Sequence, residues 1–263
     1  MIYDIQPIVD NLKQFLKDQT IKGSLDIVKT SDDFASKKYI GNKIKLGQEL
    51  GFKVRVIRPE EMATSQADGI IVQLPVGEGY DEQTLVESVP KEKDVDGFHL
   101  ETLGKIMRDG NAQLAPCTAR GIVQIIYAFY NGALEGKNVV IVNRSNIVGK
   151  PLAMMLLGLD CTVTVCHSKT PEKVLLQHLK EADVVVTAVG KKNFIKRPML
   201  KDGALVVDVA INRDENGKVC GDVAECVKNS PYVWTTPVPR GVGQLTVLNL
   251  LYNTHCASRK GEC

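Results

Sequence analysis

Hydrophobic positions in the first half of the chain follow two periods, one helical and one extended. Residues at helical spacing predict an amphipathic helix at the start of the chain: Ile5, Ile8, Val9, Leu12, Phe15 and Leu16. Alternating or continuous apolar runs predict strands over 24–30, 53–57 and 69–74. Between the first two strands we expect a helix over 31–50, capped by Ser31-Asp32-Asp33 and ended by Gly51.

The next segments are shorter and more polar. The link over 58–68 is barely long enough for a crossover that includes a helix, so a loop or a single turn is expected there. Short helices are predicted near 81–88 and 101–108, and they flank a polar loop over 91–99. A longer apolar helix is predicted over 121–130.

The second half alternates regularly between strand and helix patterns. Four strands are predicted, over 138–142, 162–166, 184–187 and 204–209. Thr170-Pro171-Glu172 is a typical helix start, a Pro/Gly loop spans 235–243, and a last helix is predicted over 245–252. Alternation of this kind is typical of an α/β domain whose parallel sheet carries helices on both faces.

Composition excludes several classes of protein. The 263 residues are 44% hydrophobic and 24% charged, with 33 basic against 31 acidic residues and a net charge of +2. This balance gives no general attraction to nucleic acid or membrane, and no apolar stretch is long enough to cross a bilayer. The N-terminus does not resemble a signal peptide. Seven cysteines without Cys-x-x-Cys or zinc-spaced histidines indicate reduced thiols in a cytoplasmic protein that binds no metal.

The strand, turn and helix start in VVIVNRSNIVGKP (139–151) indicate a nucleotide site. Its single glycine makes it a weak signal alone. The second strand adds to it, because it ends in Cys166-His167-Ser168-Lys169 without the acid that takes an NAD ribose hydroxyl. Hydroxyl and basic groups there, with Arg144, suit a 2′-phosphate. We therefore favour NADP over NAD; the alternative is a solvated basic turn.

Four stretches of the first half carry polar groups beside apolar elements. Tyr39 and Lys43 are four residues apart, which puts them on one helix face. The others are Val72-Gln73-Leu74-Pro75, the loop KDVDGFH (93–99), and Pro116-Cys117-Thr118. Each has an ordinary alternative: an exposed helix face, a polar strand end, turn-forming aspartates and a buried thiol.

Together these stretches resemble one family, the bifunctional methylenetetrahydrofolate dehydrogenase/methenyltetrahydrofolate cyclohydrolases. The resemblance spans almost the whole chain, in order: ASKKYIGNK (35–43), DGIIVQLP (68–75), KDVDGFH (93–99), PCTARGI (116–122), RSNIVGKP (144–151), TVTVCHSKT (162–170), DVVVTAVGK (183–191), DVAINR (208–213) and TPVPRGVG (236–243).

The resemblance implies a two-domain α/β fold. A folate-binding catalytic domain would comprise residues 1–120 and 245–263, with the C-terminal helix returning to it. An NADP-binding Rossmann-like domain would comprise residues 121–244. The implied reactions are NADP-dependent oxidation of 5,10-methylenetetrahydrofolate and hydrolysis of the methenyl product to 10-formyltetrahydrofolate. The implied partners are tetrahydrofolate derivatives and a second copy of the chain, forming a homodimer through the nucleotide domain.

Residue roles carry over from the resemblance by matching motif positions. The implied catalytic residues are Lys43, Tyr39, Gln73 and Asp96. The implied substrate-binding residues are Tyr39, Val72, Gln73, Leu74, Asp96, Pro239, Gly241 and Gly243. The implied cofactor-binding residues are Asn143, Arg144, Ser145, Gly149, Ser168 and Ile211.

Physical chemistry fits these roles. A lysine that acts as a base near neutral pH must lose much of its ordinary pKa of about 10.4. Burial and a cationic methenyl ligand both lower the pKa, whereas a carboxylate partner would raise it. The neutral Gln73 orients the amine without raising the pKa. Asp96 offers two acceptors to the donor-rich edge of an aminopterin.

The chain also departs from the family pattern. The family usually has Gly and Pro where Arg240 and Gln244 stand, Pro in place of Ala119, and Gly in place of Asn143 and Ala210. Ala210 would be strained if its φ were positive. The helix usual between the second and third strands of the nucleotide half is expected to be missing.

Two other readings therefore remain open. One is a shikimate-dehydrogenase-like NADP oxidoreductase, which shares the two-domain plan and a catalytic lysine. The other is a non-catalytic folate- or nucleotide-binding homologue, a reading that Arg240 and the expected loss of a helix make plausible.

Overall fold

A computed structural model describes residues 1–32 and 34–259 of the chain. The chain divides into two compact units. The three-stranded unit comprises Asp10–Cys117 and Val247–Cys263, and the five-stranded unit comprises Met1–Val9 and Thr118–Thr246. The boundaries between the units fall within helices α1 (Gln6–Asp18) and α9 (Val242–Ser258), and at the start of α5 (Cys117–Phe129).

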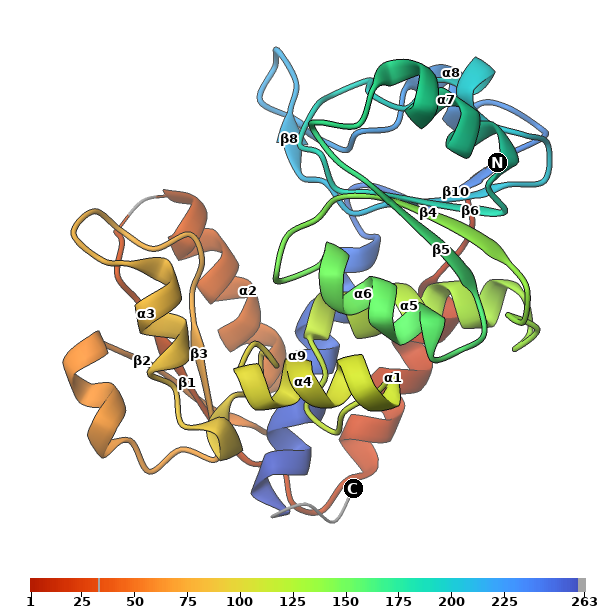
Figure 1. Ribbon diagram of the computed structural model, residues 1–263. Helices are drawn as coiled ribbons and strands as arrows, with labels where there is room; N and C mark the ends of the chain where they lie inside the picture. The colour runs from red at the N-terminus through yellow and green to blue at the C-terminus, as the bar shows by residue number, and fades with distance from the viewer. Residues whose placement is uncertain (33, 260–263) are drawn as a thin grey trace. The chain divides into compact units, whose positions relative to one another are not determined.

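The three-stranded unit is a parallel sheet in the order β2-β1-β3 (Figure 1). The strands are β1 (Ser24–Val28), β2 (Lys53–Ile57) and β3 (Gly69–Val72). Their connections contain α2 (Phe34–Glu49), η1 (Pro59–Thr64), α3 (Glu82–Glu87), η2 (Lys91–Lys93) and α4 (Leu100–Asp109). Since β1 pairs with β2 on one side and β3 on the other, the strand order reverses beside β1, which is where open α/β sheets bind ligands.

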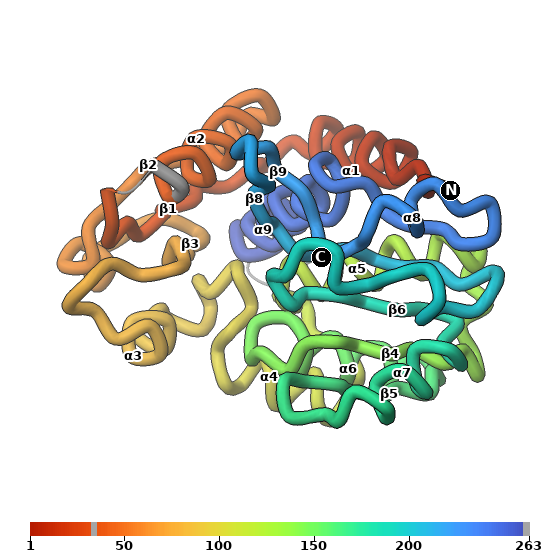
Figure 2. The backbone as a smooth tube through the Cα atoms, turned by 90° about the horizontal axis from the view of Figure 1, so that it is seen from above, coloured from red at the N-terminus to blue at the C-terminus, as the bar shows by residue number. Residues whose placement is uncertain are grey.

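Each face of this sheet is closed by apolar side chains. One cluster joins the strands to α3 and η1: Val28, Ile57, Met62, Ile70, Val72, Val89 and the partly buried Leu85 and Val86. Elsewhere α2 packs closely on β2 and α9 at Gly47, where an added Cβ would meet Val54 of β2 and Leu251 of α9. Figure 2 shows α2 lying along β1 and β2. Helix α2 is thereby held against the sheet with little freedom to shift.

A buried carboxylate also fixes the centre of the sheet. Asp26 in β1 is 1% exposed. It accepts two hydrogen bonds from the Arg55 guanidinium, at 2.9 and 2.7 Å, and one from the Ser65 hydroxyl at 2.7 Å. Full pairing is what makes a buried charge tolerable.

The five-stranded unit is a parallel sheet in the order β10-β7-β6-β4-β5. Its strands are β4 (Asn138–Val142), β5 (Thr162–Cys166), β6 (Val184–Thr187), β7 (Leu205–Asp208) and β10 (Trp234–Thr235). Its other elements are α6 (Gly149–Leu157), α7 (Glu172–Glu181), η3 (Arg197–Met199), α8 (Glu225–Lys228) and the antiparallel pair β8 (Asn212–Arg213) and β9 (Val219–Cys220).

Alternate strand residues face opposite sides of this sheet. One side, with α7 and α8, holds a cluster of Val140, Val142, Cys166, Leu179, Val185, Val206, Val223, Val227 and Val233. Helices α5 and α6 lie on the other side (Figure 1). The intervening residues, such as Val139, Ile141 and Val186, are also fully buried. The unit is therefore the doubly wound α/β layer that the strand and helix alternation predicts.

The sequence predicted most elements to within a few residues, with several differences. The final helix is longer than predicted and covers Val242–Ser258. Helix α5 begins at Cys117 rather than at 121. Strand β3 ends at Val72, so Gln73 and Leu74 lie beyond it. The strands β8, β9 and β10 and the helix α8 were not predicted. Asp33, part of the predicted cap of α2, lies outside the described residues.

One prediction was wrong. The helix between the second and third strands of the nucleotide half is present: α7 covers Glu172–Glu181 between β5 and β6. Thr170-Pro171-Glu172 does mark its start, and Leu179 anchors it in the core cluster. The α-helix is absent from the following link, between β6 and β7, which contains only the short η3.

Within residues 1–32 and 34–259, no helix has the length and apolar character needed to cross a membrane.

Candidate active site

The first group of predicted site residues meets at the carboxyl-terminal edge of the three-stranded sheet. Lys43 projects from α2, one turn after Tyr39. Gln73 follows β3, and its backbone nitrogen donates to the carbonyl of Val28 at 2.9 Å, which ties the end of β3 to the end of β1. The reversal of strand order at β1 thus brings a helix residue and a strand-end residue together.

A chain of two hydrogen bonds orients the lysine. The Lys43 Nζ donates to Gln73 Oε1 at 2.9 Å, and Gln73 Nε2 donates to the Leu74 carbonyl at 2.6 Å. Because the Leu74 carbonyl can only accept, it fixes which end of the amide faces the amine. Gln73 is therefore a neutral acceptor for Lys43, and it leaves the ammonium without a directly bonded carboxylate.

The surroundings lower the pKa of Lys43. Burial is the main cause, and the charges of Asp96 and the Cys117 thiol oppose it. Lys43 as a whole residue is only partly buried, so a ligand can approach its side chain. A lysine whose pKa is lowered by burial is a candidate general base.

The two aspartates of KDVDGFH have different tasks. Asp94 is 4% exposed and accepts hydrogen bonds from the backbone nitrogens of Gly97 and His99, at 3.0 and 2.6 Å. The turn-forming alternative is therefore correct for Asp94. Asp96 keeps part of its surface accessible. Asp94 therefore holds the loop in shape, and Asp96 is the carboxylate that the loop presents.

Asp96 is an unusual carboxyl group. Burial raises its pKa to about 6, with Asp94 adding to the effect, while Lys43 and the Cys117 thiol oppose it. Although its side chain has some accessible surface, protein atoms surround it closely enough to strip much of its hydration. At neutral pH it is an anion poised near its pKa, beside an amine whose pKa is lowered.

The remaining candidate residues of the three-stranded unit differ in how exposed they are. Cys117 is fully buried, and its thiol donates to the Val95 carbonyl at 3.2 Å, as the buried-thiol alternative expects. Val72 is buried at the end of β3, and Leu74 is half-buried. Tyr39 is 39% exposed. Its ring is thus available to a ligand.

The second group lies at the carboxyl-terminal edge of the five-stranded sheet, where β4 separates β5 from β6. Asn143 follows β4 and organises the loop. Its Oδ1 accepts from the backbone nitrogens of Ser145 and Gly149, at 2.9 and 3.1 Å, and from the Ser145 hydroxyl at 2.7 Å. Its Nδ2 donates to the Ala188 carbonyl beyond β6, at 2.8 Å. The amide therefore ties together the two loops that border the reversal point.

Glycine is required at position 149. A Cβ there would overlap the backbone carbonyl of Asn143. Gly149 is also the first residue of α6, so its small size lets the helix start pack directly on the loop after β4. This close packing is the role of a glycine in a dinucleotide-binding turn.

Arg144 and Ser168 lie at the same edge of the sheet. Val142 of β4 and Cys166 of β5 are register partners, and each predicted residue follows its strand end by two positions. Both side chains are exposed. Within the described parts of the chain, Arg144 forms no ion pair with a carboxylate. A basic group and a hydroxyl are thus available together, as a 2′-phosphate would require.

A buried hydrogen-bond network around Asp222 supports the loop after β6 at this edge of the sheet. The sequence reasoning missed this network. Asp222 accepts hydrogen bonds from the Thr187 hydroxyl at 2.8 Å, the backbone nitrogens of Val189 and Lys191 at 2.7 Å each, and Asn212 Nδ2 at 3.1 Å. It joins the loop after β6 to β8. Ile211, a predicted cofactor contact that is 53% exposed, directly precedes β8 and is positioned by it.

Pro239 and Gly241 lie in the loop before α9, and Gly243 is the second residue of α9. Gly241 is buried, and a Cβ there would overlap the Pro237 carbonyl, whereas Pro239 and Gly243 are exposed. Arg240 has a φ of 69°, in the left-handed region, which explains why glycine suits this position. The Gln244 side chain donates to the Arg240 carbonyl at 2.8 Å and helps to hold that conformation.

Ala210 is not strained. Among the described residues, the non-glycine positions with positive φ are Asn131, Asp160, Asn193 and Arg240. Ala210 is 6% exposed, and its backbone nitrogen donates to Asp208 at 3.3 Å. The loss of a glycine at this position therefore has no conformational cost.

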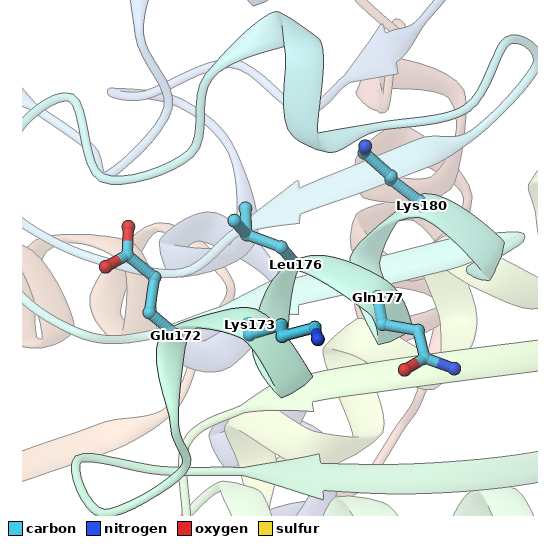
Figure 3. Close-up of a pocket in the computed structure, with 5 residues that line it drawn as sticks. All are labelled: Glu172, Lys173, Leu176, Gln177 and Lys180. Carbon is cyan, nitrogen blue, oxygen red and sulfur yellow. The ribbon is translucent and has the colours of Figure 1, made fainter.

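Two surface hollows among the described residues are lined by other side chains. One is on α7 and is lined by Glu172, Lys173, Leu176, Gln177 and Lys180 (Figure 3). The other lies at the ends of β1 and β2, where Lys29 and Arg58 are already paired with Asp32 and Glu61. Neither contains a predicted site residue. In the part of the chain that the structure describes, no group of three or more His, Cys, Asp or Glu side chains could hold a metal ion.

These features define a class of protein. A doubly wound parallel sheet with a glycine-tight loop after its first strand is the architecture of a dinucleotide-binding domain. It is accompanied by a second α/β unit that carries a buried lysine, a glutamine and a carboxylate. Comparison with known proteins narrows the class, because residues 116–262 match the model of the tetrahydrofolate dehydrogenase/cyclohydrolase NAD(P)-binding domain. The chain belongs to this family.

Individual relatives agree over nearly the full length. The bifunctional protein FolD of Bacillus velezensis is 40% identical over an alignment of 259 residues, and the match covers 93% of this chain and 90% of the relative. The crystal structure of the FolD dehydrogenase/cyclohydrolase from Campylobacter jejuni matches with a TM-score of 0.87 at 36% identity, over 97% of this chain and 95% of that one. The Trypanosoma brucei enzyme, solved with NADP and an inhibitor, matches with a TM-score of 0.89 at 26% identity, over 100% and 99% of the two chains.

The turn of KDVDGFH gives a direct test of the site's construction. Gly97 has a φ of +81°, and a Cβ there would overlap the Leu114 carbonyl. We expect Gly97→Ala to lower the free energy of unfolding by at least about 2 kcal/mol, since left-handed strain and overpacking add. The matched control is Gly104→Ala in α4, where a Cβ meets nothing within 4 Å. This control should gain about 0.5–1 kcal/mol. Urea unfolding measures both, and equal stabilities would contradict the assignment.

Proposed function

We propose that this protein is a bifunctional enzyme of one-carbon metabolism. It oxidises 5,10-methylenetetrahydrofolate to the methenyl form with NADP, and it hydrolyses the methenyl form to 10-formyltetrahydrofolate. The single observation that carries the proposal is the hydrogen bond from Lys43 to the neutral Gln73, with Asp96 nearby. The family membership supports both activities and disfavours the shikimate-dehydrogenase-like and non-catalytic readings.

On the folate side, Asp96 is assigned to the pterin. Its carboxylate offers two acceptors to the donor-rich edge of the aminopterin ring, which is a charge-assisted pairing. Tyr39, one turn from Lys43 and exposed, is assigned to stacking on the substrate. The substrate envelope is assigned to Val72 and Leu74 of the three-stranded unit and to Pro239, Gly241 and Gly243 of the five-stranded unit.

Lys43 is assigned the proton transfer. When bound, NADP supplies the acceptor for a hydride from the methylene carbon between N5 and N10. Water then adds to the methenyl carbon, and the Lys43 amine takes a proton from that water as the new C–O bond forms. As the bond from this carbon to N5 breaks, N5 takes that proton back from the Lys43 ammonium, and the added hydroxyl loses its proton to solvent, which leaves the formyl group on N10. Gln73 keeps the amine directed, because it accepts one N–H and leaves the lone pair of the neutral amine free.

On the cofactor side, the residues of the five-stranded unit fit NADP. The close packing of α6 on the loop after β4 presents a helix N-terminus of the kind that binds phosphates. Arg144 and Ser168 are assigned to the 2′-phosphate. Ser145 and Ile211 are assigned further cofactor contacts, and Gly149 allows close approach. Asn143 is assigned a contact through its backbone, because its side chain is engaged within the protein.

The proposal also covers the domain boundaries, the oligomeric state and the location in the cell. We assign the folate-binding domain to residues 1–120 and 245–263 and the NADP-binding domain to 121–244. A cytoplasmic homodimer, without nucleic-acid partners, is proposed through the five-stranded unit. Its edge strand β5 supports this, with Val165 38% exposed. A solution mass equal to one chain would contradict the dimer.

An absorbance assay tests the function as a whole. The protein is supplied with methylenetetrahydrofolate and either NADP or NAD, and the reduced nicotinamide and methenyl products are followed. Turnover with NADP is expected. Turnover of shikimate without turnover of the folate, or tight folate binding without any turnover, would contradict the proposal.

Lys43→Met should abolish cyclohydrolase activity, because it removes the base while keeping much of the side-chain volume. We expect a loss of about 100-fold or more in kcat, the usual range for a general base. Hydrolysis of methenyltetrahydrofolate is measured by its absorbance. Lys45→Met, an exposed lysine of the same helix, is the control and should keep parental activity. A fully active Lys43→Met would remove the role given to Lys43.

The pKa of Asp96 predicts a pH dependence of substrate binding. The carboxyl is ionised above its pKa of about 6, and only the ionised form makes the charge-assisted pairing. As the pH falls below about 6, kcat/KM for methylenetetrahydrofolate in the dehydrogenase reaction should fall by up to tenfold per pH unit. Asp96→Asn should have a lower plateau and lack this acid limb. If the limb persists in Asp96→Asn, another group causes it.

Arg144 sets the expected cofactor preference. Arg144→Ala should raise the KM for NADP by about tenfold, as the loss of one charge-assisted hydrogen bond implies, and should change the KM for NAD by less than about twofold. The comparison of the two cofactors is its own control, since misfolding would affect both. A parallel rise in both constants would argue against a 2′-phosphate contact.

A further inference from the structure

The C-terminal helix carries a buried amide directed at the Asp96 loop. Asn253 of α9 is fully buried and belongs to the three-stranded unit. Its Nδ2 donates to the Val95 carbonyl at 2.9 Å and to the Ala115 carbonyl at 3.0 Å, and it lies 3.5 Å from Cys117 Sγ. One amide nitrogen thus contacts two segments that are distant from it in sequence.

Both segments border the Asp96 carboxylate. Val95 directly precedes Asp96, and Ala115 leads into Cys117, whose thiol also donates to the Val95 carbonyl at 3.2 Å. On the other side of Asp96, Gly97 packs so closely on the 114–116 backbone that a Cβ would overlap it. Asp96 is therefore held between two points at which its loop is fastened to the segment before α5.

The chemistry of the clamp requires an amide. An Asn nitrogen has two hydrogens in a fixed plane, and here each is directed to one carbonyl, so the two carbonyls are held at a set separation. An ionised aspartate would present oxygen to both carbonyls. An apolar side chain would leave two buried carbonyls without this donor, at a cost that usually exceeds that of a surface hydrogen bond.

We propose that Asn253 is a positioning residue for folate recognition, acting through the loop that carries Asp96. The inference rests on the proposed function of Asp96 as the pterin-binding carboxylate. Charge-assisted hydrogen bonds are short and directional, so a small displacement of the carboxylate weakens the pairing. Asn253 thus contributes to substrate affinity without touching the substrate.

A double-mutant cycle tests the proposal. Asn253→Ala is made in the parent and in Asp96→Asn, and the KM values for methylenetetrahydrofolate and NADP are measured in the dehydrogenase reaction. In the parent, Asn253→Ala should raise the folate KM by about tenfold and change the NADP KM by less than about twofold. In Asp96→Asn the same substitution should change the folate KM by less than about twofold, because the pairing is already lost.

Thr254→Val is the matched control. Thr254 is the next residue of α9 and is fully buried, and its hydroxyl donates within the helix to the Leu250 carbonyl at 2.8 Å. Valine keeps its shape, so both KM values should stay within about twofold of the parent. If Asn253→Ala does not fold, Asn253→Ser, which keeps one donor, takes its place and should raise the folate KM severalfold.

The outcomes separate this proposal from the assignment of Asp96. An unchanged folate KM in Asn253→Ala, or equal rises in the folate and NADP constants, would overturn the role of Asn253. The same tenfold effect in the Asp96→Asn background would also overturn it, because Asn253 would then act independently of Asp96. If Asp96→Asn itself leaves the folate KM unchanged, the proposed function of Asp96 fails instead.

Discussion

The hydrogen bond between Lys43 and Gln73 is the constraint on which the candidate active site depends. A buried amine can act as a base only if its partner leaves its pKa low, and an amide oxygen does so where a carboxylate would not. This requirement also constrains the fold. Gln73 is fixed because β3 ends beside β1, and Lys43 is fixed because α2 packs on β2 and α9 through Gly47. The order β2-β1-β3 is therefore what makes the pair possible.

The two units apply the same physical solution with different residues. In each, a side-chain amide at the carboxyl-terminal edge of a parallel sheet accepts one hydrogen bond and donates another. Gln73, after β3, accepts from Lys43 of α2 and donates to the Leu74 carbonyl, and Asn143, after β4, links its own loop to Ala188. An amide suits this position because it donates and accepts at once without adding charge. Asn143, at a position where glycine is common, thus adds side-chain hydrogen bonds that stabilise the nucleotide loop.

Sequence reasoning succeeded where the information is local or periodic. Strand β4 is observed over the predicted residues, and the register of Val142 with Cys166 gives the expected proximity of Arg144 and Ser168. Residue type alone did not separate Asp94 from Asp96, and the choice of Asp96 rested on the resemblance; the folded turn shows that Asp94 accepts the backbone donors. Asp222 and Asn253 were missed for a related reason. Their partners are distant in sequence, and neither Asp222, between β9 and α8, nor Asn253, in α9, belongs to a motif with a recognisable spacing.

The electrostatics of Lys43 and Asp96 limit how the two activities can share one site. In the unliganded protein each group favours the charged form of the other, so Asp96 partly offsets the effect of burial on the pKa of Lys43. In the proposed reaction, the pterin draws the Asp96 carboxylate into hydrogen bonds, and the oxidised folate brings a positive charge next to the amine. Both changes weaken the stabilisation of the ammonium and lower its pKa further. The base would then become available mainly after hydride transfer, which would order hydrolysis after oxidation without any movement of the protein.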